Sequence, residues 1–359
     1  MHKKTILYII DNLTRGGAET LLVGILPDII RRYNVIMVTL SDLCEFKQEE
    51  LICTEKYSLG FAGKFSFLPC VIKLKKILKH HKPHLVHAHL LNSSIIARLA
   101  CPKNIPMACT LHSILSKNAF NNSWIYRNIE KAIFNKNHYV IAVSDTVLKD
   151  YVKSIARPEN SFVLKNYIAD VFTKKNHGTK INDMSSTIKM VAVGNIKKVK
   201  NYEYLLKALV YLKNYNISLD IYGKGERNYI KKLQGDIIEN KLPVTLKGPF
   251  DNIDKILPTY RLFVMSSLYE GFGIAAIEAM ALGLPLLLPD IAVFKEVTFN
   301  NALFFNLNAP EQFAKIVIDI IENKYDMQTL SERGIAIVKE NYTKQAYLEK
   351  LYTIYDEIF

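Results

Sequence analysis

The sequence predicts an α/β protein of two doubly wound, Rossmann-like domains that face each other across a cleft. Short apolar segments of strand length alternate with helical segments, in one series before residue 168 and in a second series after residue 187. A chain of 359 residues is too long for one hydrophobic core of ordinary size and suits two. The segment 168–187 is polar, so we expect it to link an N-terminal domain, 1–167, to a C-terminal domain, 188–343.

The first series has expected strands at 5–10, 35–40, 85–90, 105–111, 139–143 and 162–166. The loop after its first strand contains Gly16 and Gly17 and leads into a helix, and glycines at such a place let a ligand approach the backbone. A glycine pair alone is more often an ordinary tight turn. Residues 41–63 carry little signal.

A helix is expected from Leu68 to Lys82, with apolar residues on one face and lysines over the other. The lysines are Lys73, Lys75, Lys76, Lys79 and Lys82. A charged face of this kind is usually only solvated. Basic amphipathic helices also contact anionic lipid, so an anionic membrane surface is a candidate partner.

Histidines are concentrated in one short segment, because five of the nine lie between residues 80 and 89. Metal binding would need further ligands from elsewhere, and the sequence shows none, so we expect no metal site. His112 follows the strand at 105–111, and the carboxyl end of a parallel strand faces ligands. The helix expected at 123–135 carries aromatic residues that either line an acceptor cleft or belong to the core.

The second series has expected strands at 188–193, 217–222, 244–247, 262–265, 285–288 and 303–305. The loop 194–201 brings three lysines to the start of a helix, which favours a phosphate site because cations oppose the helix dipole there. A polar loop holding Glu270 follows the strand at 262–265, and a short apolar helix, 274–282, holds Glu278. A carboxylate among apolar neighbours is costly to bury alone, so Glu278 meets either a protein partner or a ligand.

The stretch from Ser267 to Pro285 closely resembles the E-x7-E signature of retaining nucleotide-sugar glycosyltransferases of the GT-B fold, in the large glycosyltransferase family 4 group, also called glycosyl transferases group 1. The resemblance implies that Glu270 lies beside the donor sugar and that Glu278 holds the ribose hydroxyls. Backbone N–H groups of the donor-binding residues Phe272, Gly273 and Ile274 then face the departing diphosphate.

Four further places are similar to motifs of this family. Gly16-Gly17-Ala18-Glu19 resembles its GGAE loop, which approaches the donor phosphates and sugar, and the His of Thr110-Leu111-His112 corresponds to one beside the donor sugar. The segment 247–250, which ends at Phe250, resembles the segment whose backbone recognises the nucleobase. Lys200 matches the Lys of G-R-L-x-x-x-K-N, which grips the diphosphate.

One position departs from that pattern, because Asn195 stands where the family has Arg. The change removes a bidentate, permanently charged group from the leaving phosphate. Either Lys197 or Lys198 substitutes for it, or the donor is held more weakly, or the protein has lost activity.

The net charge of +13 favours an anionic partner. The lysines are dispersed and no nucleic-acid module is recognisable, so we expect no nucleic-acid partner. Five cysteines without CxxC spacing indicate reduced thiols. No apolar run spans a membrane and no signal peptide is recognisable, so a cytoplasmic location is expected, with peripheral contact to the inner membrane face as the candidate exception.

The residues and the resemblance together predict a retaining glycosyltransferase with a nucleotide-sugar donor, a UDP-sugar being favoured. The expected acceptor is a glycan or lipid-linked molecule of bacterial surface polysaccharide synthesis, such as capsule or lipopolysaccharide. Glu270, His112 and Lys200 are the expected catalytic residues, and no cofactor or metal is expected because no D-x-D triplet occurs. By resemblance, the helix 344–359 packs back on the first domain. A GT-B sugar-nucleotide epimerase and an inactive nucleotide-binding paralogue are the alternatives.

Overall fold

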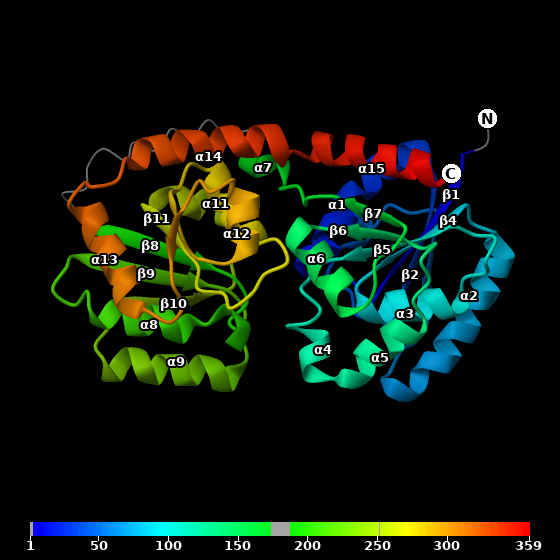
Figure 1. Ribbon diagram of the computed structural model, residues 1–359, viewed down its shortest axis with the longest axis horizontal. Coiled ribbons are helices and arrows are strands. Elements are labelled where there is room, and N and C mark those ends of the chain that lie inside the picture. Colours follow the sequence, from blue (N-terminus) through cyan, green and yellow to red (C-terminus); the bar gives the residue numbers. More distant parts are fainter. Residues whose placement is uncertain (1–2, 174–186, 251) are drawn as a thin grey trace. The chain divides into compact units, whose positions relative to one another are not determined.

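The computed structural model describes residues 3–173, 187–250 and 252–359, and divides the chain into two compact units (Figure 1). Unit 1 comprises Met1–Tyr167 and Lys344–Phe359, and unit 2 comprises Ile168–Thr343. Of the expected linker 168–187, residues 174–186 lie outside the described residues, and the preceding residues belong to unit 2.

Unit 1 is built on a seven-stranded parallel sheet in the order β3-β2-β1-β4-β5-β6-β7. The strands are β1 (Thr5–Ile10), β2 (Asn34–Thr39), β3 (Glu55–Ser58), β4 (Leu85–His89), β5 (Met107–Leu111), β6 (Tyr139–Ala142) and β7 (Asn160–Val163). The order reverses between β1 and β4, which pair directly. In an open parallel sheet such a switch point leaves a crevice at the carboxyl ends of the strands, where ligands bind.

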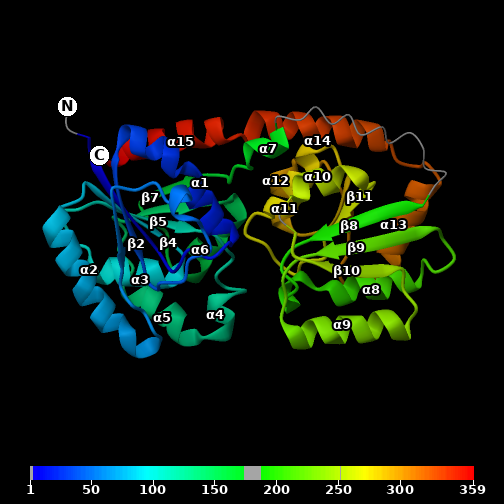
Figure 2. The ribbon, with the colours of Figure 1, turned by 180° about the vertical axis from the view of Figure 1, so that it is seen from behind.

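Helices cover both faces of this sheet (Figures 1 and 2). They are α1 (Gly17–Arg32), α2 (Phe67–His81), α3 (Leu91–Ala100), α4 (Ala119–Asn122), α5 (Trp124–Ala132), α6 (Asp145–Ser154) and α15 (Lys344–Ile358), with single 3-10 turns at Gln48–Glu50 and Lys64–Ser66. Leu7 and Ile9 share a core with buried residues of α2 and α3. Because side chains alternate along a strand, Tyr8 points to the other face.

The C-terminal helix α15 packs on that other face of unit 1. The hydroxyl of its Tyr355 lies 2.7 Å from the hydroxyl of Tyr8, and both rings are fully buried. Ion pairs join its two ends to α1, from Lys344 to Asp28 at 2.7 Å and from Asp356 to Arg32 at 2.7 Å. The C-terminal helix therefore belongs to the same unit as the N-terminal half of the chain.

Unit 2 is built on a six-stranded parallel sheet in the order β10-β9-β8-β11-β12-β13. The strands are β8 (Ile188–Val193), β9 (Ile217–Tyr222), β10 (Val244–Gly248), β11 (Leu262–Val264), β12 (Leu286–Pro289) and β13 (Leu303–Phe305). The order reverses between β8 and β11, so this sheet is also doubly wound.

The helices of unit 2 lie on both faces of its sheet (Figure 1). They are α7 (Asp170–Thr173), α8 (Tyr202–Val210), α9 (Arg227–Glu239), α10 (Ile253–Ile256), α11 (Ile274–Ala281), α12 (Ala292–Thr298), α13 (Pro310–Ile321) and α14 (Met327–Asn341), with 3-10 turns at Lys198–Lys200 and Leu257–Thr259. Buried residues of α8, α9 and α13 form one apolar core with the strands. Among the described residues of both units, no helix has the length and apolar character needed to cross a bilayer.

Candidate functional site

The switch point of unit 2 brings two loops together at the carboxyl ends of β8 and β11. The hydroxyl of Ser266, just after β11, lies 2.9 Å from the backbone oxygens of both Lys200 and Asn201, in the loop after β8, and shares its one proton between them. The N–H of Leu268 donates to the carbonyl of Val199 at 2.9 Å. These bonds fix the lysine-bearing loop against the loop that carries Glu270.

Lys200 and Glu270 meet directly at this edge. The Lys200 ammonium lies 2.5 Å from Oε1 of Glu270, and the Ser267 hydroxyl donates to the same oxygen at 2.8 Å. Both side chains of the ion pair are largely buried. Two of the three expected catalytic residues, 70 positions apart in sequence, are therefore brought into contact by the strand order.

The amino end of α11 presents free backbone donors beside this pair. Gly273 caps the helix with a φ of 83°, and a Cβ on it would lie 2.6 Å from the Phe294 ring, so only glycine fits there without strain. Among the described residues, no hydrogen-bond acceptor is found for the N–H groups of Gly273 and Ile274. Unpaired N–H groups at a helix start attract anions.

The side chain of Phe272 points away from this edge, so only its backbone is left to face a ligand. Its ring is buried and packs edge-on against Tyr342, with 5.5 Å between the ring centroids. The side chain thus belongs to the core beneath the loop.

Glu278 lies one turn into α11, and its environment differs from that of Glu270. Glu278 is itself partly buried, between the fully buried Ile277 and Ala279, and its carboxylate has no hydrogen-bond or ion-pair partner among the described residues. Burial raises the pKa of Glu278 from its ordinary value to about 8. An unpaired carboxylate of this kind is available to hydrogen-bond donors that a ligand brings.

Glycines let the loops after β8 and β9 approach each other closely. A Cβ on Gly223 would lie 2.0 Å from the backbone oxygen of Gly194, so no larger residue fits at Gly223. In the loop that follows Gly194, the side chains of Asn195, Lys197 and Lys198 are exposed. This loop therefore carries two solvent-exposed lysines beside the partly buried Lys200.

Phe250 ends the segment after β10 and keeps its ring half-exposed. The ring lies edge-on to Tyr222, with 6.0 Å between the centroids. Gly248, the last residue of β10, has a φ of 75°, a turn conformation that suits glycine. An exposed aromatic ring at this edge offers a stacking surface for a planar group.

In unit 1, Gly16 and Gly17 begin α1 at the carboxyl end of β1. The Glu19 carboxylate folds back over Gly16, where a Cβ would lie 2.3 Å from one of its oxygens. Burial raises the pKa of Glu19. The glycine at position 16 therefore makes room for an acidic side chain of its own helix.

His112 lines a cavity of about 180 Å³ at the switch point of unit 1. Its Nε2 lies 3.0 Å from Nδ1 of His89, so one of the two rings donates a hydrogen bond to the other. Burial lowers the pKa of His112 to about 4, and that of His89 also lies well below its ordinary value. Both rings are neutral at neutral pH, and His112 is positioned by its neighbour.

Two carboxylates that the sequence analysis did not identify also line this cavity. Asp11 accepts hydrogen bonds from the N–H and the hydroxyl of Ser93 at 2.9 and 2.6 Å. Glu130, from α5, pairs with the buried Arg98 at 2.9 Å, and its second oxygen is buried without a partner among the described residues. The position of Asp11, directly after an expected strand, is a signal that could have identified it. The sequence of α5 gives no such signal, because Glu130 looks there like any charged residue on the surface of a helix.

Within the described parts of the chain, no three His, Cys, Asp or Glu side chains are grouped so as to hold a metal ion.

Comparison with known proteins matches each of the two parts of the chain to a family of glycosyltransferases. Residues 15–169 match the model of the family Glycosyltransferase Family 4, and residues 173–336 match the model of Glycosyl transferases group 1. The putative glycosyltransferase EpsF of Bacillus subtilis is 25% identical over 312 residues, which cover 80% of this chain and 79% of EpsF.

A second relative is a Campylobacter jejuni enzyme, N-acetylgalactosamine-N,N'-diacetylbacillosaminyl-diphospho-undecaprenol 4-alpha-N-acetylgalactosaminyltransferase. It is 27% identical over 292 residues, which cover 76% of this chain and 77% of the enzyme. Among solved structures, Alr3699/HepE of Anabaena in complex with UDP superposes with a TM-score of 0.84 at 19% identity, covering 98% of this chain and 100% of HepE.

The two family models together account for nearly all of the chain, and the solved structure shares the two parallel-sheet domains. The chain belongs to the family 4, group 1 glycosyltransferases and has their GT-B fold.

Proposed function

We propose that this protein transfers a sugar from a nucleotide-sugar donor, a UDP-sugar in preference to others, to a glycan or lipid-linked acceptor with retention of anomeric configuration. The observation that carries the proposal is the grouping at one edge of unit 2. There the Lys200–Glu270 pair, the free N–H groups of Gly273 and Ile274 and the unpartnered Glu278 come from adjoining loops and one helix.

Negative charge develops on the departing diphosphate during transfer, so stabilisation there lowers the barrier most. Lys200 is the cation we assign to this task, with the N–H groups at the start of α11. Gly16 and Gly17 are assigned to the donor phosphates as well. Asn195 leaves the position of the family Arg uncharged, and the exposed Lys197 and Lys198 supply the missing charge.

The carboxylates have separate roles in this proposal. Glu278 accepts hydrogen bonds from the two ribose hydroxyls, which stabilise its ionised form and offset the burial that raises its pKa. Glu270 moves from Lys200 to hydroxyls of the donor sugar once the diphosphate takes its place at the ammonium. His112 positions the same sugar, and Phe250 marks the segment beside the nucleobase.

The comparisons favour the donor and acceptor classes. HepE was solved in complex with UDP and also with UDP-glucose. The Campylobacter relative is named for transfer to a sugar on diphospho-undecaprenol, and another relative, from Staphylococcus aureus, for transfer to poly(ribitol-phosphate). These names support a nucleotide-sugar donor and an acceptor in the assembly of a bacterial surface polysaccharide.

We further propose that transfer needs no metal, because Lys200 and the backbone donors neutralise the diphosphate charge. Turnover in the presence of EDTA should equal turnover in its absence. A loss of activity with EDTA that Mg²⁺ or Mn²⁺ restores would contradict this part of the proposal.

The proposed function is tested by a thermal-shift panel with UDP, GDP and their sugars, followed by transfer assays on lipid-diphosphate acceptors. We expect UDP or a UDP-sugar to raise the melting temperature most, and nuclear magnetic resonance of the product to show the anomeric configuration of the donor. Turnover without any acceptor, with a new sugar epimer as product, would instead identify an epimerase. Nucleotide binding without turnover on any acceptor would identify an inactive paralogue in which Asn195 has replaced the essential Arg.

A further inference from the structure

Unit 1 contains a long segment without a single acidic residue. From Lys56 to Ile129 the sequence has no Asp or Glu, yet it has eleven Lys and Arg residues. This segment includes α2, α3 and the loop from α3 to β5. Most of the net charge of the chain therefore comes from this one segment of unit 1.

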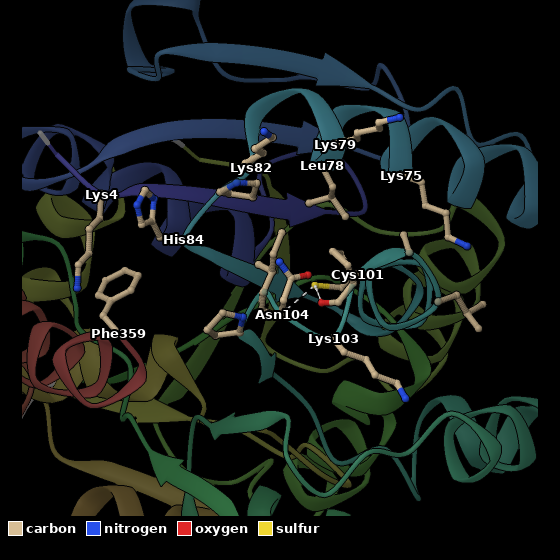
Figure 3. Close-up of a pocket in the computed structure, with 16 residues that line it drawn as sticks. Lys4, Lys75, Leu78, Lys79, Lys82, His84, Cys101, Lys103, Asn104 and Phe359 are labelled. Atoms are coloured by element: carbon tan, nitrogen blue, oxygen red, sulfur yellow. Dashed lines mark hydrogen bonds between the residues drawn. The ribbon is translucent and has the colours of Figure 1, made fainter.

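A hollow of about 830 Å³ lies within this region, at the amino ends of the strands of unit 1 and thus at the edge opposite His112 (Figure 3). Lys75, Lys79 and Lys82 border it from α2 and its C-cap, and Lys103 borders it from the loop before β5. Its floor is apolar and includes Leu78, Ala100 and Ile105. None of the described residues that line it is acidic.

These four lysines are not engaged in ion pairs with any described acidic residue. Lys73, by contrast, donates a hydrogen bond of 2.8 Å to the carbonyl of Leu59, so it is not part of the group. The negative end of the α2 dipole accounts for cations at its last turn, such as Lys79. It does not account for Lys75 in mid-helix or for Lys103 in a loop.

An exposed apolar row continues this basic region along α2 and the 3-10 turn before it. Phe65 is 99% exposed, Leu68 is 68% exposed and Ile72 is 48% exposed. Leu68, Ile72, Lys75 and Lys79 follow at spacings of three or four residues, so they share one face of the helix, while Val71, Leu74 and Leu78 are buried on the other. One helix face is therefore apolar toward its amino end and basic toward its carboxyl end.

We propose that this face of unit 1 docks on the surface of an anionic phospholipid bilayer. The lysines around the hollow bind lipid phosphates, and Phe65, Leu68 and Ile72 enter the boundary between headgroups and acyl chains, as in other interfacial amphipathic helices. A soluble anion would need only the lysines. The exposed apolar row beside them is explained by a partner with an apolar interior beneath its charge.

The test is co-sedimentation of the full-length protein with vesicles of phosphatidylcholine, with and without phosphatidylglycerol. We expect binding to the anionic vesicles that weakens with salt, and little binding to phosphatidylcholine alone. The double variant Lys75→Glu/Lys103→Glu should lower the partition coefficient by about 25-fold or more, since each lysine near an anionic surface contributes about fivefold. Its matched control is Lys213→Glu/Lys231→Glu, which reverses two exposed lysines of unit 2.

A second pair of variants tests the apolar row. Phe65→Ser/Leu68→Ser should also reduce binding, whereas Ile238→Ser, which removes a 76% exposed side chain from unit 2, should leave it unchanged. Circular dichroism and the melting temperature confirm that each variant is folded.

Three results would overturn the proposal. The first is wild-type protein that binds anionic vesicles no better than neutral ones. The second is full binding by both double variants at this surface. The third is protection of the wild type against heating by inorganic phosphate, lost in Lys75→Glu/Lys103→Glu, without vesicle binding, which would show that the hollow takes a free phosphate.

Discussion

At the scale of single residues, Lys200 is the group on which the proposed chemistry depends most. Lys200→Ala should lower kcat by about 10²- to 10³-fold, because it removes the cation that faces the departing diphosphate. The fold should persist, since Lys200 lies at the edge of the sheet and Ser267 still holds Glu270. Steady-state transfer assays measure the effect, with Lys213→Ala, at an exposed lysine of unit 2 that has no role in the proposed site, as the control. Wild-type turnover by Lys200→Ala would remove Lys200 from the site.

Glu278 should make the stability of the ligand-free protein depend on pH. The folded-state pKa is about 8, against an ordinary value of 4.5. Between these values the unfolded chain ionises while the folded protein keeps the proton, so the free energy of unfolding decreases as pH rises and levels off above pH 8. The buried histidines act in the opposite direction up to about pH 7.5, because they stay neutral in the folded protein while the unfolded chain, with an ordinary histidine pKa of 6.5, still binds protons. The Glu278 effect is therefore the difference between the wild type and a variant that cannot ionise at this position.

Urea unfolding at a series of pH values measures this dependence. Glu278→Gln cannot ionise, so the free energy of unfolding of the wild type relative to this variant should decrease as pH rises from about 5 to 8. An identical slope in the variant and the wild type would show that Glu278 titrates normally.

The chemistry of these residues could be read from the sequence, but their contacts could not. Glu278 among apolar neighbours and the lysines of the loop 194–201 stand out from residues near them in the sequence, so a local pattern is enough to identify them. The Lys200–Glu270 contact depends on β8 and β11 being neighbours, which local pattern does not specify. The burial of the Phe272 ring and the bond from His89 to His112 likewise depend on tertiary packing.

At the scale of elements, the start of α11 depends on the conformation of Gly273. Gly273→Ala should destabilise the protein by about 1–3 kcal/mol, because the residue has a positive φ and a Cβ would clash with Phe294. It should also weaken nucleotide binding, since the N–H groups of the helix start would shift. Denaturant titration and calorimetric binding measure the two effects.

Gly235→Ala is the matched control for this change. Gly235 lies inside α9, and a Cβ there meets no atom within 4 Å. Alanine should therefore stabilise the protein by about 0.5–1 kcal/mol and leave nucleotide binding unchanged. Equal effects of the two substitutions would show that Gly273 has no special conformational role.

Apolar periodicity located every described strand of the two sheets except β3, most of them to within two residues, and it failed where the periodicity is absent. β3 has four polar or aromatic residues, Glu55–Ser58, at the exposed edge of its sheet, so it carries no apolar run. Edge strands bury little surface. The strand β3 forms only because its backbone pairs with β2, and this pairing leaves no pattern of apolar residues in the sequence.

At the scale of the whole molecule, the division into two units ties the end of the chain to its beginning. The helix α15 buries Leu348, Leu351, Ile354, Tyr355 and Ile358 in unit 1. At about 1.5–3 kcal/mol for each buried side chain, their loss is comparable with the entire stability of a typical domain. A chain that stops at Thr343 should therefore contain an unfolded unit 1 beside a folded unit 2.

Hydrogen exchange read by mass spectrometry distinguishes the two units in that variant. We expect amides of β1, β4 and β5 to lose protection and those of β8 and β9 to keep it, because unit 2 has a separate core. Full protection of unit 1 in the shortened chain would show that α15 is dispensable for the fold.

The two-unit architecture was predictable because alternating strands and helices form two series separated by a polar segment. The packing of α15 on unit 1 was implied only by family resemblance. Its apolar stripe fits either unit, and the buried contact from Tyr355 to Tyr8 decides between them.

Calorimetric titration of UDP tests most directly whether unit 2 holds the donor at Glu278 and Lys200. The wild type and Lys213→Ala should bind alike, and Glu278→Ala should bind about tenfold to a hundredfold more weakly, as expected for lost hydrogen bonds to a charged group. Lys200→Ala should also bind more weakly. Wild-type affinity in both Glu278→Ala and Lys200→Ala would contradict the account.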